Sequence, residues 1–283
     1  MTALEFTFVV LALSGLAGFL GALTGLGGGV VVVPALTLAL GVDMKYAIGA
    51  SLVSVIATSS GAAAAYVREG FSNIRIGMFL EIATTLGAVT GAFLTGRVGT
   101  HALAIVFGLM LLQAAYQSLK GVAFKGIAGH AASLVSDGLA QRLRLGGSYP
   151  VDGQRQQYGA RNVPGGFAMM FGAGVLSGLL GIGSGAVKVI AMDNVMRIPF
   201  KVSTTTSNFM IGVTAAASAG FYFSHGYIDP RVAMPVMLGV LVGALLGAKV
   251  LVHARVKTLR VVFGVAILAL GIEMIANGIA GKI

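Results

Sequence analysis

This 283-residue chain has neither cysteine nor tryptophan, and charged residues are scarce. Without cysteine the protein has no disulfide, no zinc–thiolate site and no cysteine nucleophile. Charged residues make up 10% of the chain, whereas a soluble globular domain carries about 25%. Hydrophobic residues make up 57%, and the mean hydropathy is +0.93. The chain therefore has too little polar surface to coat a globule in water, which predicts a surface covered largely by lipid.

Acidic residues are scarcer than basic ones: 9 Asp and Glu stand against 19 Lys and Arg, for a net charge of +10. A basic balance is compatible with nucleic-acid binding, but here the basic residues are scattered along the ends of apolar runs. That placement is typical of residues that set membrane topology and contact anionic lipid headgroups. We expect membrane lipid as a partner, and no nucleic acid.

The two halves of the chain resemble each other at a fixed offset of 156 residues. Between Gly18 and Leu112, roughly one position in four is identical to its counterpart. Apolar bias explains scattered Gly and Leu matches, but not polar residues matched without a gap. The matched pairs include Gly25/Gly181, Gly27/Gly183, Gly29/Gly185, Lys45/Lys201, Ser51/Ser207, Thr58/Thr214, Tyr66/Tyr222 and Arg75/Arg231. The chain is a duplication.

Each half contains an apolar run, a glycine cluster, a short apolar run and three longer runs. The longer runs are close to the ~20 residues that cross a bilayer, whereas a short run of 11 residues spans only about 16 Å of helix. Each glycine cluster is therefore expected at the tip of a broken or re-entrant hairpin. The runs are Leu4–Leu23, Val30–Leu40, Tyr46–Val67, Ile76–Thr95 and Ala102–Leu119, then Phe167–Leu180, Ala186–Met196, Val202–Phe223, Val232–Val252 and Leu259–Ile275.

A hairpin enters and leaves on one side of the membrane, so it contributes an even number of crossings. With three further crossings, each half crosses the membrane an odd number of times, and the two halves therefore have opposite orientations. We predict an all-α polytopic membrane protein of two inverted-topology repeats. The first repeat spans 1–120, a linker 121–165 and the second repeat 166–283. Basic residues in the linker place it in the cytoplasm, with both termini outside. Within the linker, Leu134, Leu139 and Leu143 favour a short surface helix, and Asp152-Gly153 favours a turn.

The glycine clusters have three interpretations. A nucleotide loop requires a preceding strand and a βαβ unit, which the sequence lacks. Small residues also permit close helix packing. Alternatively, glycine allows the backbone to unwind, so that free N–H groups and helix N-termini form an anion site near the membrane centre. On this interpretation the substrate-binding candidates are Gly27, Gly28, Gly29, Gly183, Ser184 and Gly185.

Lys188 follows the second cluster within apolar sequence, where an ionisable residue is by default functional. We interpret it as an anion ligand, with snorkelling or pairing with Asp193 as the alternative. Ser51, Ser207 and Asn208 are further substrate-binding candidates, because hydroxyls and an amide bind an oxyanion without adding charge. The alternative role for these polar groups is hydrogen bonding between helices.

Glu81 is the acid that lies well inside a long apolar run, and its repeat counterpart is Met237. One interpretation is that it carries a coupling proton. The other is a structural bond to a neighbouring helix. The residues leave both open.

The stretch from Gly18 to Val30, followed by Val33-Pro34, resembles the glycine signature of the TauE/SafE sulfite exporter family, also called toluene sulfonate uptake permeases. Gly178 to Gly185, with Ser203 to Asn208, is similar to the matching second signature, although Ser184 replaces a glycine and Ile190 aligns with Pro34. The resemblance covers essentially the whole chain. It implies secondary transport of sulfite or small organosulfur anions, in a direction that the resemblance does not fix.

The expected function is secondary transport of small sulfur-containing anions, of the sulfite or organosulfonate class, across a bacterial inner membrane. The alternative is a channel or uniporter for another small anion or a metal ion. The sequence shows no catalytic constellation, so we expect no enzyme, no cofactor and no bound metal. A small anion and membrane lipid are the expected partners, with a homodimer as the assembly to test.

Overall fold

The structure is a computed structural model that describes residues 2–24, 28–68, 72–123, 136–151, 154–251 and 256–283. Its first half contains α1 (Ala3–Thr24), α2 (Gly29–Pro34), the π-helical segment η1 (Ala35–Ala39), α3 (Met44–Arg68), α4 (Ile74–Thr95) and α5 (Thr100–Ala123). Its second half contains α7 (Val163–Leu180), α8 (Gly185–Ile190), the π-helical segment η2 (Ala191–Val195), α9 (Phe200–Ser224), α10 (Pro230–Leu251) and α11 (Val256–Ile279). This is the predicted all-α polytopic architecture.

The element boundaries repeat at the offset that the sequence predicts. Adding 156 to each bound of α2 through α5 gives the bounds of α8 through α11, and α1 and α7 end at equivalent residues. Even the π-helical segments correspond. Pro34 precedes η1 but Ile190 precedes η2, so proline does not cause this geometry. Such π-helical turns are frequent at functional sites.

The helices of each half pack against the other half. α1 of the first half lies along α10 of the second, and α7 of the second half lies along α4 of the first. Because α1 corresponds to α7 and α10 corresponds to α4, the same contact occurs twice. Glycine allows both close approaches: a Cβ on Gly18 would lie 2.3 Å from the Val240 oxygen, and one on Gly174 would lie 2.2 Å from the Thr84 oxygen. Thr84 and Val240 are themselves equivalent positions. The two halves are therefore related by a pseudo-two-fold arrangement.

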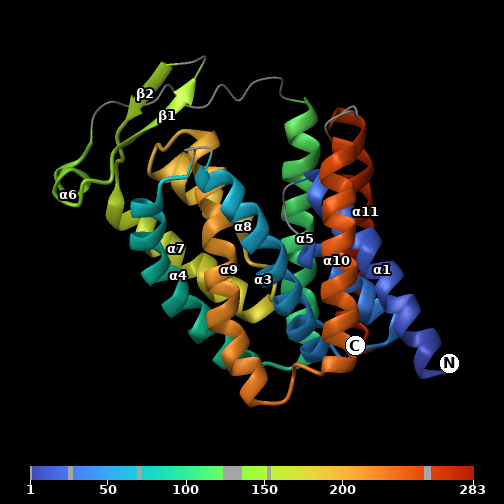
Figure 1. The fold of residues 1–283 in the computed structure, drawn as a ribbon. Helices are drawn as coiled ribbons and strands as arrows, with labels where there is room; N and C mark the ends of the chain where they lie inside the picture. The colour runs from blue at the N-terminus through green and yellow to red at the C-terminus, as the bar shows by residue number, and fades with distance from the viewer. Residues whose placement is uncertain (1, 25–27, 69–71, 124–135, 152–153, 252–255) are drawn as a thin grey trace.

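Both termini lie at one end of the bundle, and the β1–β2 hairpin of the linker lies at the other (Figure 1). The linker between the halves and the two termini thus lie at opposite ends of the bundle. This geometry is the one that an inverted repeat requires. The side of the membrane that each end faces remains a prediction.

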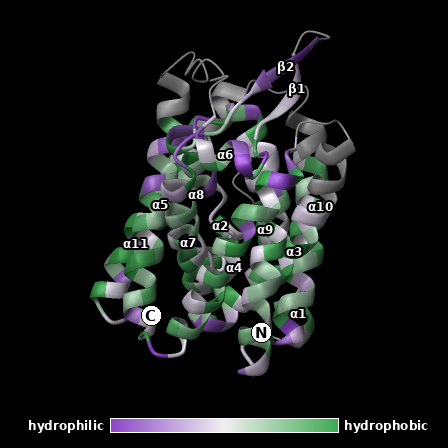
Figure 2. Ribbon diagram, turned by 90° about the vertical axis from the view of Figure 1, so that its left-hand side faces the viewer, coloured by the Kyte–Doolittle hydropathy of each residue, from purple (hydrophilic) through white to green (hydrophobic). Residues whose placement is uncertain are grey.

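Apolar residues cover the middle of the bundle, and hydrophilic residues gather at its ends and on the linker (Figure 2). Five of the helices, α1, α4, α5, α7 and α10, are long and apolar enough to span a membrane within the described residues. The 25-residue helices α3 and α9 are long enough as well, but they carry more serine and threonine and pack against each other at the centre. Many of their hydroxyls are buried in protein, among them those of Ser51, Ser207 and Thr214.

The linker is more structured than the sequence suggests. It contains α6 (Gly138–Arg142) and an antiparallel pair, β1 (Gly147–Val151) and β2 (Gln154–Tyr158). The expected surface helix is present as α6, with Leu139 and Leu143 exposed. Leu134 and the predicted Asp152-Gly153 turn lie outside the described residues.

The linker also packs into a hydrophobic cluster with both repeats, through Ala140, Leu145, Tyr158 and Ala160. The Tyr158 hydroxyl accepts a hydrogen bond of 2.7 Å from the Asn73 side chain. Asn73 in turn caps α4 by accepting from the Ile76 amide at 3.1 Å. Burial raises the pKa of Tyr158 to about 12, so the phenol is neutral at physiological pH.

Candidate functional site

The two hairpin tips meet at Ser51 of α3. Its hydroxyl donates to the Gly181 oxygen at 2.9 Å, with the Gly29 oxygen 3.4 Å away. Gly29 has no room for a side chain, because a Cβ there would lie 2.7 Å from the Ser51 hydroxyl and 3.4 Å from the Gly181 oxygen. Ser51 therefore ties a tip of one repeat to that of the other. Gly27 lies outside the described residues.

The second tip is unwound. Gly181, Gly183 and Ser184 all adopt left-handed backbone angles, with φ of +68°, +70° and +43°. Ser184 tolerates this conformation at a cost, and its hydroxyl donates to the Ala173 oxygen at 2.6 Å. Gly28 in the first tip is right-handed, with φ of −65°. The Gly-to-Ser difference between the signatures therefore coincides with a difference in backbone geometry.

Ser207, the repeat counterpart of Ser51, donates to the Gly185 oxygen at 3.2 Å. Asn208 follows it on α9 and is half-buried. Both serine candidates therefore contact tip carbonyls in this conformation. Ser51 and Ser207 thus make the interhelical hydrogen bonds that are the alternative to substrate binding, and substrate binding by these serines and by Asn208 stays a prediction.

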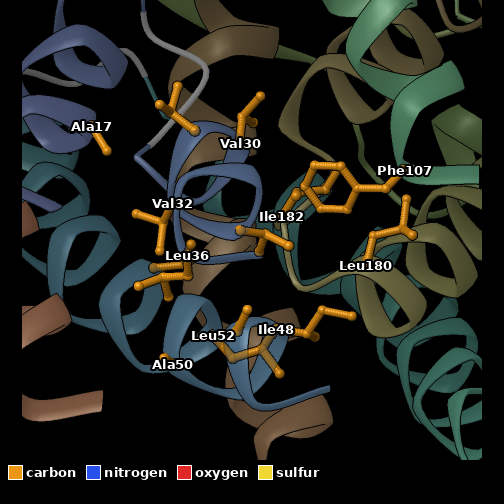
Figure 3. Close-up of a cluster of buried hydrophobic side chains, with 14 of the residues drawn as sticks. Ala17, Val30, Val32, Leu36, Ile48, Ala50, Leu52, Phe107, Leu180 and Ile182 are labelled. Carbon is orange, nitrogen blue, oxygen red and sulfur yellow. The ribbon is translucent and has the colours of Figure 1, made fainter. Parts of the chain in front are cut away.

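Apolar side chains surround the tips (Figure 3). Ile182 of the second tip belongs to one buried cluster with side chains from α1, α2, α3 and α5. The labelled members of this cluster are Ala17, Val30, Val32, Leu36, Ile48, Ala50, Leu52, Phe107, Leu180 and Ile182.

A small cavity of about 30 Å³ lies against the start of α8. Val30 of the first tip, the segment 184–187 and the α5 residues Gln113 and Gln117 contribute to its wall. Its volume is sufficient for about one water molecule. The two glutamines are not among the residues predicted for the site, although amides within an apolar run are a visible signal.

Lys188 is fully buried, with 0% of its surface exposed. Its ammonium donates to the Thr214 hydroxyl of α9 at 2.5 Å. The snorkelling alternative is therefore wrong for this conformation. Lys188 does not line the small cavity, so the described structure places the lysine side chain and the tip cavity at different positions around α8.

Glu81 of α4 is also buried, with 7% exposure. Its Oε1 atom accepts a hydrogen bond from Thr214 at 2.7 Å and one from Thr85 at 3.3 Å. The structural bond to a neighbouring helix is thus present. Lys188 exerts an electrostatic effect on Glu81. The sequence predictions for Lys188 and Glu81 are separate. A basic and an acidic residue that each lie within an apolar run are nevertheless expected to pair when they are buried.

The charged site exists on one side of the pseudo-two-fold only. The counterparts of Lys188, Thr214 and Glu81 are Val32, Thr58 and Met237. The threonine is retained while both charges are replaced by apolar side chains. This asymmetry extends what the unequal glycine signatures indicate.

A duplicated helical bundle with apolar spans, two broken hairpins and a buried charged centre is the architecture of a multi-pass membrane transporter. The family model of the sulfite exporter TauE/SafE matches residues 10–274. The chain belongs to this family.

Several bacterial relatives are similar over most of their length. The probable membrane transporter protein YunE of Bacillus subtilis is 28% identical, over 96% of this chain and 99% of the relative. A probable membrane transporter protein of Xylella fastidiosa is 26% identical, over 94% of each chain. YdhB of Bacillus subtilis, also a probable membrane transporter protein, is 28% identical over 82% of this chain and 83% of the relative. No solved structure shows significant similarity to the chain.

Proposed function

We propose that this membrane transporter is a secondary carrier of small sulfur-containing anions, of the sulfite or organosulfonate class, and that it has no enzymatic activity. The observation that carries the proposal is Lys188, a fully buried cation among helices of both repeats. A buried cation in a membrane segment is costly and is typically kept for a ligand or coupling role. Membership of the sulfite exporter family supports the substrate class.

The proposed binding site lies between the glycine tips. It comprises Gly27, Gly28, Gly29, Ser51, Gly183, Ser184, Gly185, Lys188, Ser207 and Asn208. The contact of the two tips through Ser51 supports this location. The cavity beside them has room for about one water, so an anion requires the tips to separate or the serines to rotate away from the carbonyls.

Counterflow in proteoliposomes tests the carrier mechanism. Vesicles loaded with unlabelled sulfite should accumulate labelled sulfite transiently, and organosulfonates should compete. A channel or uniporter for another ion would show no sulfite counterflow.

Substitution of Lys188 tests the site. Hydrogen bonds to charged groups contribute about 1.5–3 kcal/mol, so Lys188→Ala should weaken sulfite binding roughly tenfold to a hundredfold. Lys282→Ala, at an exposed lysine near the C-terminus, is the matched control. Equal, small effects in monodisperse protein would remove Lys188 from the site.

We also propose that the repeats are inverted in the membrane, with the linker cytoplasmic and both termini outside. The opposite placement of the linker and the termini supports this topology (Figure 1). Reporter fusions within the linker at Asp152 and after Ile283 should give opposite sidedness. Equal sidedness would contradict the proposal.

Glu81 is our candidate for a coupling proton. Its burial at the contact of α4 with α9 supports this role. Glu81→Gln should abolish accumulation driven by a pH gradient but leave counterflow intact. Accumulation at the wild-type level in this variant would leave Glu81 with its structural bond alone.

A further inference from the structure

Three side chains from both repeats form one buried polar chain. The Lys188 ammonium donates to the Thr214 hydroxyl at 2.5 Å, and that hydroxyl contacts Glu81 Oε1 at 2.7 Å. Threonine has one hydroxyl proton, and two acceptors lie within its reach: Glu81 Oε1 at 2.7 Å and the Met210 oxygen at 2.8 Å. When that proton points to Glu81, the same hydroxyl oxygen can accept from Lys188. Opposite charges on α8 and α4 are thereby joined through α9.

The fold does not require these charges. At the equivalent place in the other repeat, Val32, Thr58 and Met237 occupy the same backbone positions. Replacing a buried ion pair with apolar residues of similar volume is often neutral or stabilising. A pair that one repeat lacks is therefore better explained by function than by packing.

The pair has unused hydrogen-bonding capacity. Glu81 Oε2 is buried without a hydrogen-bond partner. An ammonium has three donors, and Thr214 is the one acceptor recorded for Lys188 among the described residues. An incoming anion can therefore bind Lys188, and the carboxylate can accept a proton.

The surroundings of Glu81 contain no second cation among the described residues. The charged group that interacts with Glu81 is Lys188 on α8. The other polar groups that face Glu81 are the hydroxyls of Thr84, Thr85 and Thr214. α7 approaches this part of α4 through Gly174, which has no side chain. The charge state of Glu81 is thus tied to Lys188.

We propose that Glu81 is an internal counter-anion that the transported anion displaces from Lys188, and that Glu81 takes up one proton when it is displaced. This inference rests on the proposed transport function and adds how the proton on Glu81 is coupled to the anion at Lys188. In the empty carrier, Lys188 carries +1 and Glu81 carries −1. In the loaded carrier, the ammonium pairs with a monovalent anion and a proton from solvent forms the O–H bond of neutral Glu81.

The buried site is electrically neutral in both states, and this is the reason for the exchange. A net charge in a dry membrane interior is strongly unfavourable. A monovalent anion therefore crosses together with one proton in the same direction. An inward proton gradient then drives uptake, whereas export occurs when an outward anion gradient exceeds the inward proton gradient that opposes it.

Binding and protonation are reciprocally linked. If the anion binds only when Glu81 gains a proton, affinity should rise about tenfold for each unit by which pH falls, over the range where Glu81 of the empty carrier is ionised. An anion that bound the tip backbone alone would show no such dependence.

The test is a proton count during binding to the purified full-length protein. Methanesulfonate is a suitable probe because it is monovalent and ionised at every working pH. Calorimetric titrations in two buffers of different ionisation enthalpy give the protons taken up for each anion bound. We expect about one for the wild type, and none for Glu81→Gln, which keeps the shape of the side chain and should still bind.

Each outcome decides a different point. Binding by the wild type without proton uptake would overturn the inference and leave the transport proposal standing, as would undiminished uptake in Glu81→Gln. If neither methanesulfonate nor sulfite binds, the transport proposal fails, and this inference fails with it. The wild-type count needs no variant. The doubly substituted Lys188→Val/Glu81→Met protein adds a control, because proton uptake on binding there would also overturn the inference.

Discussion

The two repeats share a backbone and differ in chemistry. Their helices begin and end at equivalent residues from α2 and α8 onward, and the same close glycine contacts occur twice. Yet one repeat places Val32 where the other places the buried Lys188. The backbone therefore follows from features that both repeats share, whereas the charged site depends on residues that one repeat has and the other lacks.

Residues common to both repeats are those that let backbones approach or that tie the tips. Gly18 and Gly174 permit close helix packing, and Ser51 and Ser207 bond to tip carbonyls. Residues present once include the buried charges Lys188 and Glu81, and Ser184, where the backbone is left-handed. The helical architecture is thus duplicated, whereas the charged site is present once. The following substitutions test that division.

The largest effect is expected from converting half of the charged site into its apolar counterpart. Lys188→Val or Glu81→Met alone leaves a buried charge without its partner, which costs about 3–5 kcal/mol. The Lys188→Val/Glu81→Met double variant has the residues of the other repeat and should recover most of that loss. Unfolding of the purified protein in SDS measures each free energy. A double variant as unstable as the sum of the single variants would show that the charges are structural.

A smaller and symmetric effect is expected at the helix contacts. Gly18→Ala and Gly174→Ala each place a Cβ within 2.3 Å of a backbone oxygen, and overpacking of this kind costs about 1–3 kcal/mol. Gly172→Ala on α7 meets no atom within 4 Å and should be neutral. SDS unfolding of the three variants checks this, and clearly unequal losses at Gly18 and Gly174 would break the equivalence of the two contacts.

Substitution of the two tip serines should lower stability by modestly different amounts. Ser51 bonds to the tip of the opposite repeat, whereas Ser207 bonds to its own. Loss of the buried partner of the Gly181 oxygen in Ser51→Ala should cost about 1–2 kcal/mol. Ser207→Ala should cost nearer the membrane average of about 0.6 kcal/mol. The same unfolding assay applies, and the reverse order would remove the special role of Ser51 between the tips.

The smallest effect on stability is expected at Tyr158, which lies in the linker and belongs to neither repeat. Burial raises the pKa of its phenol from the ordinary value of 10.0 to about 12. The folded state therefore holds this proton more tightly, so its contribution to stability is complete below about pH 10 and is lost as pH rises toward 12. Absorbance titration of wild type against Tyr158→Phe should reveal one phenol ionising late. A difference spectrum titrating near pH 10 would contradict the burial of this hydroxyl.

Sequence periodicity predicted the elements closely, because apolar length and glycine position determine where a membrane helix begins and breaks. The short run predicted from Val30 begins one residue earlier, at Gly29. The β1–β2 hairpin was missed, because its alternation is brief and lies in polar sequence. The joining of Lys188 to Glu81 was also missed, since it depends on how α4, α8 and α9 cross, and a linear pattern does not contain that information.

The exchange of packing partners has a consequence for how the protein is made. α1 and α4 emerge from the ribosome first, yet they lie along α10 and α7, which are translated later. Within the bilayer the early helices can insert individually, but their main interhelical contacts await the second repeat. We therefore expect the first repeat, expressed alone, to be degraded, and co-expression of residues 1–123, which end with α5, and residues 124–283 to restore a stable complex. Assembly of this carrier is in effect the intramolecular association of two mutually dependent subunits.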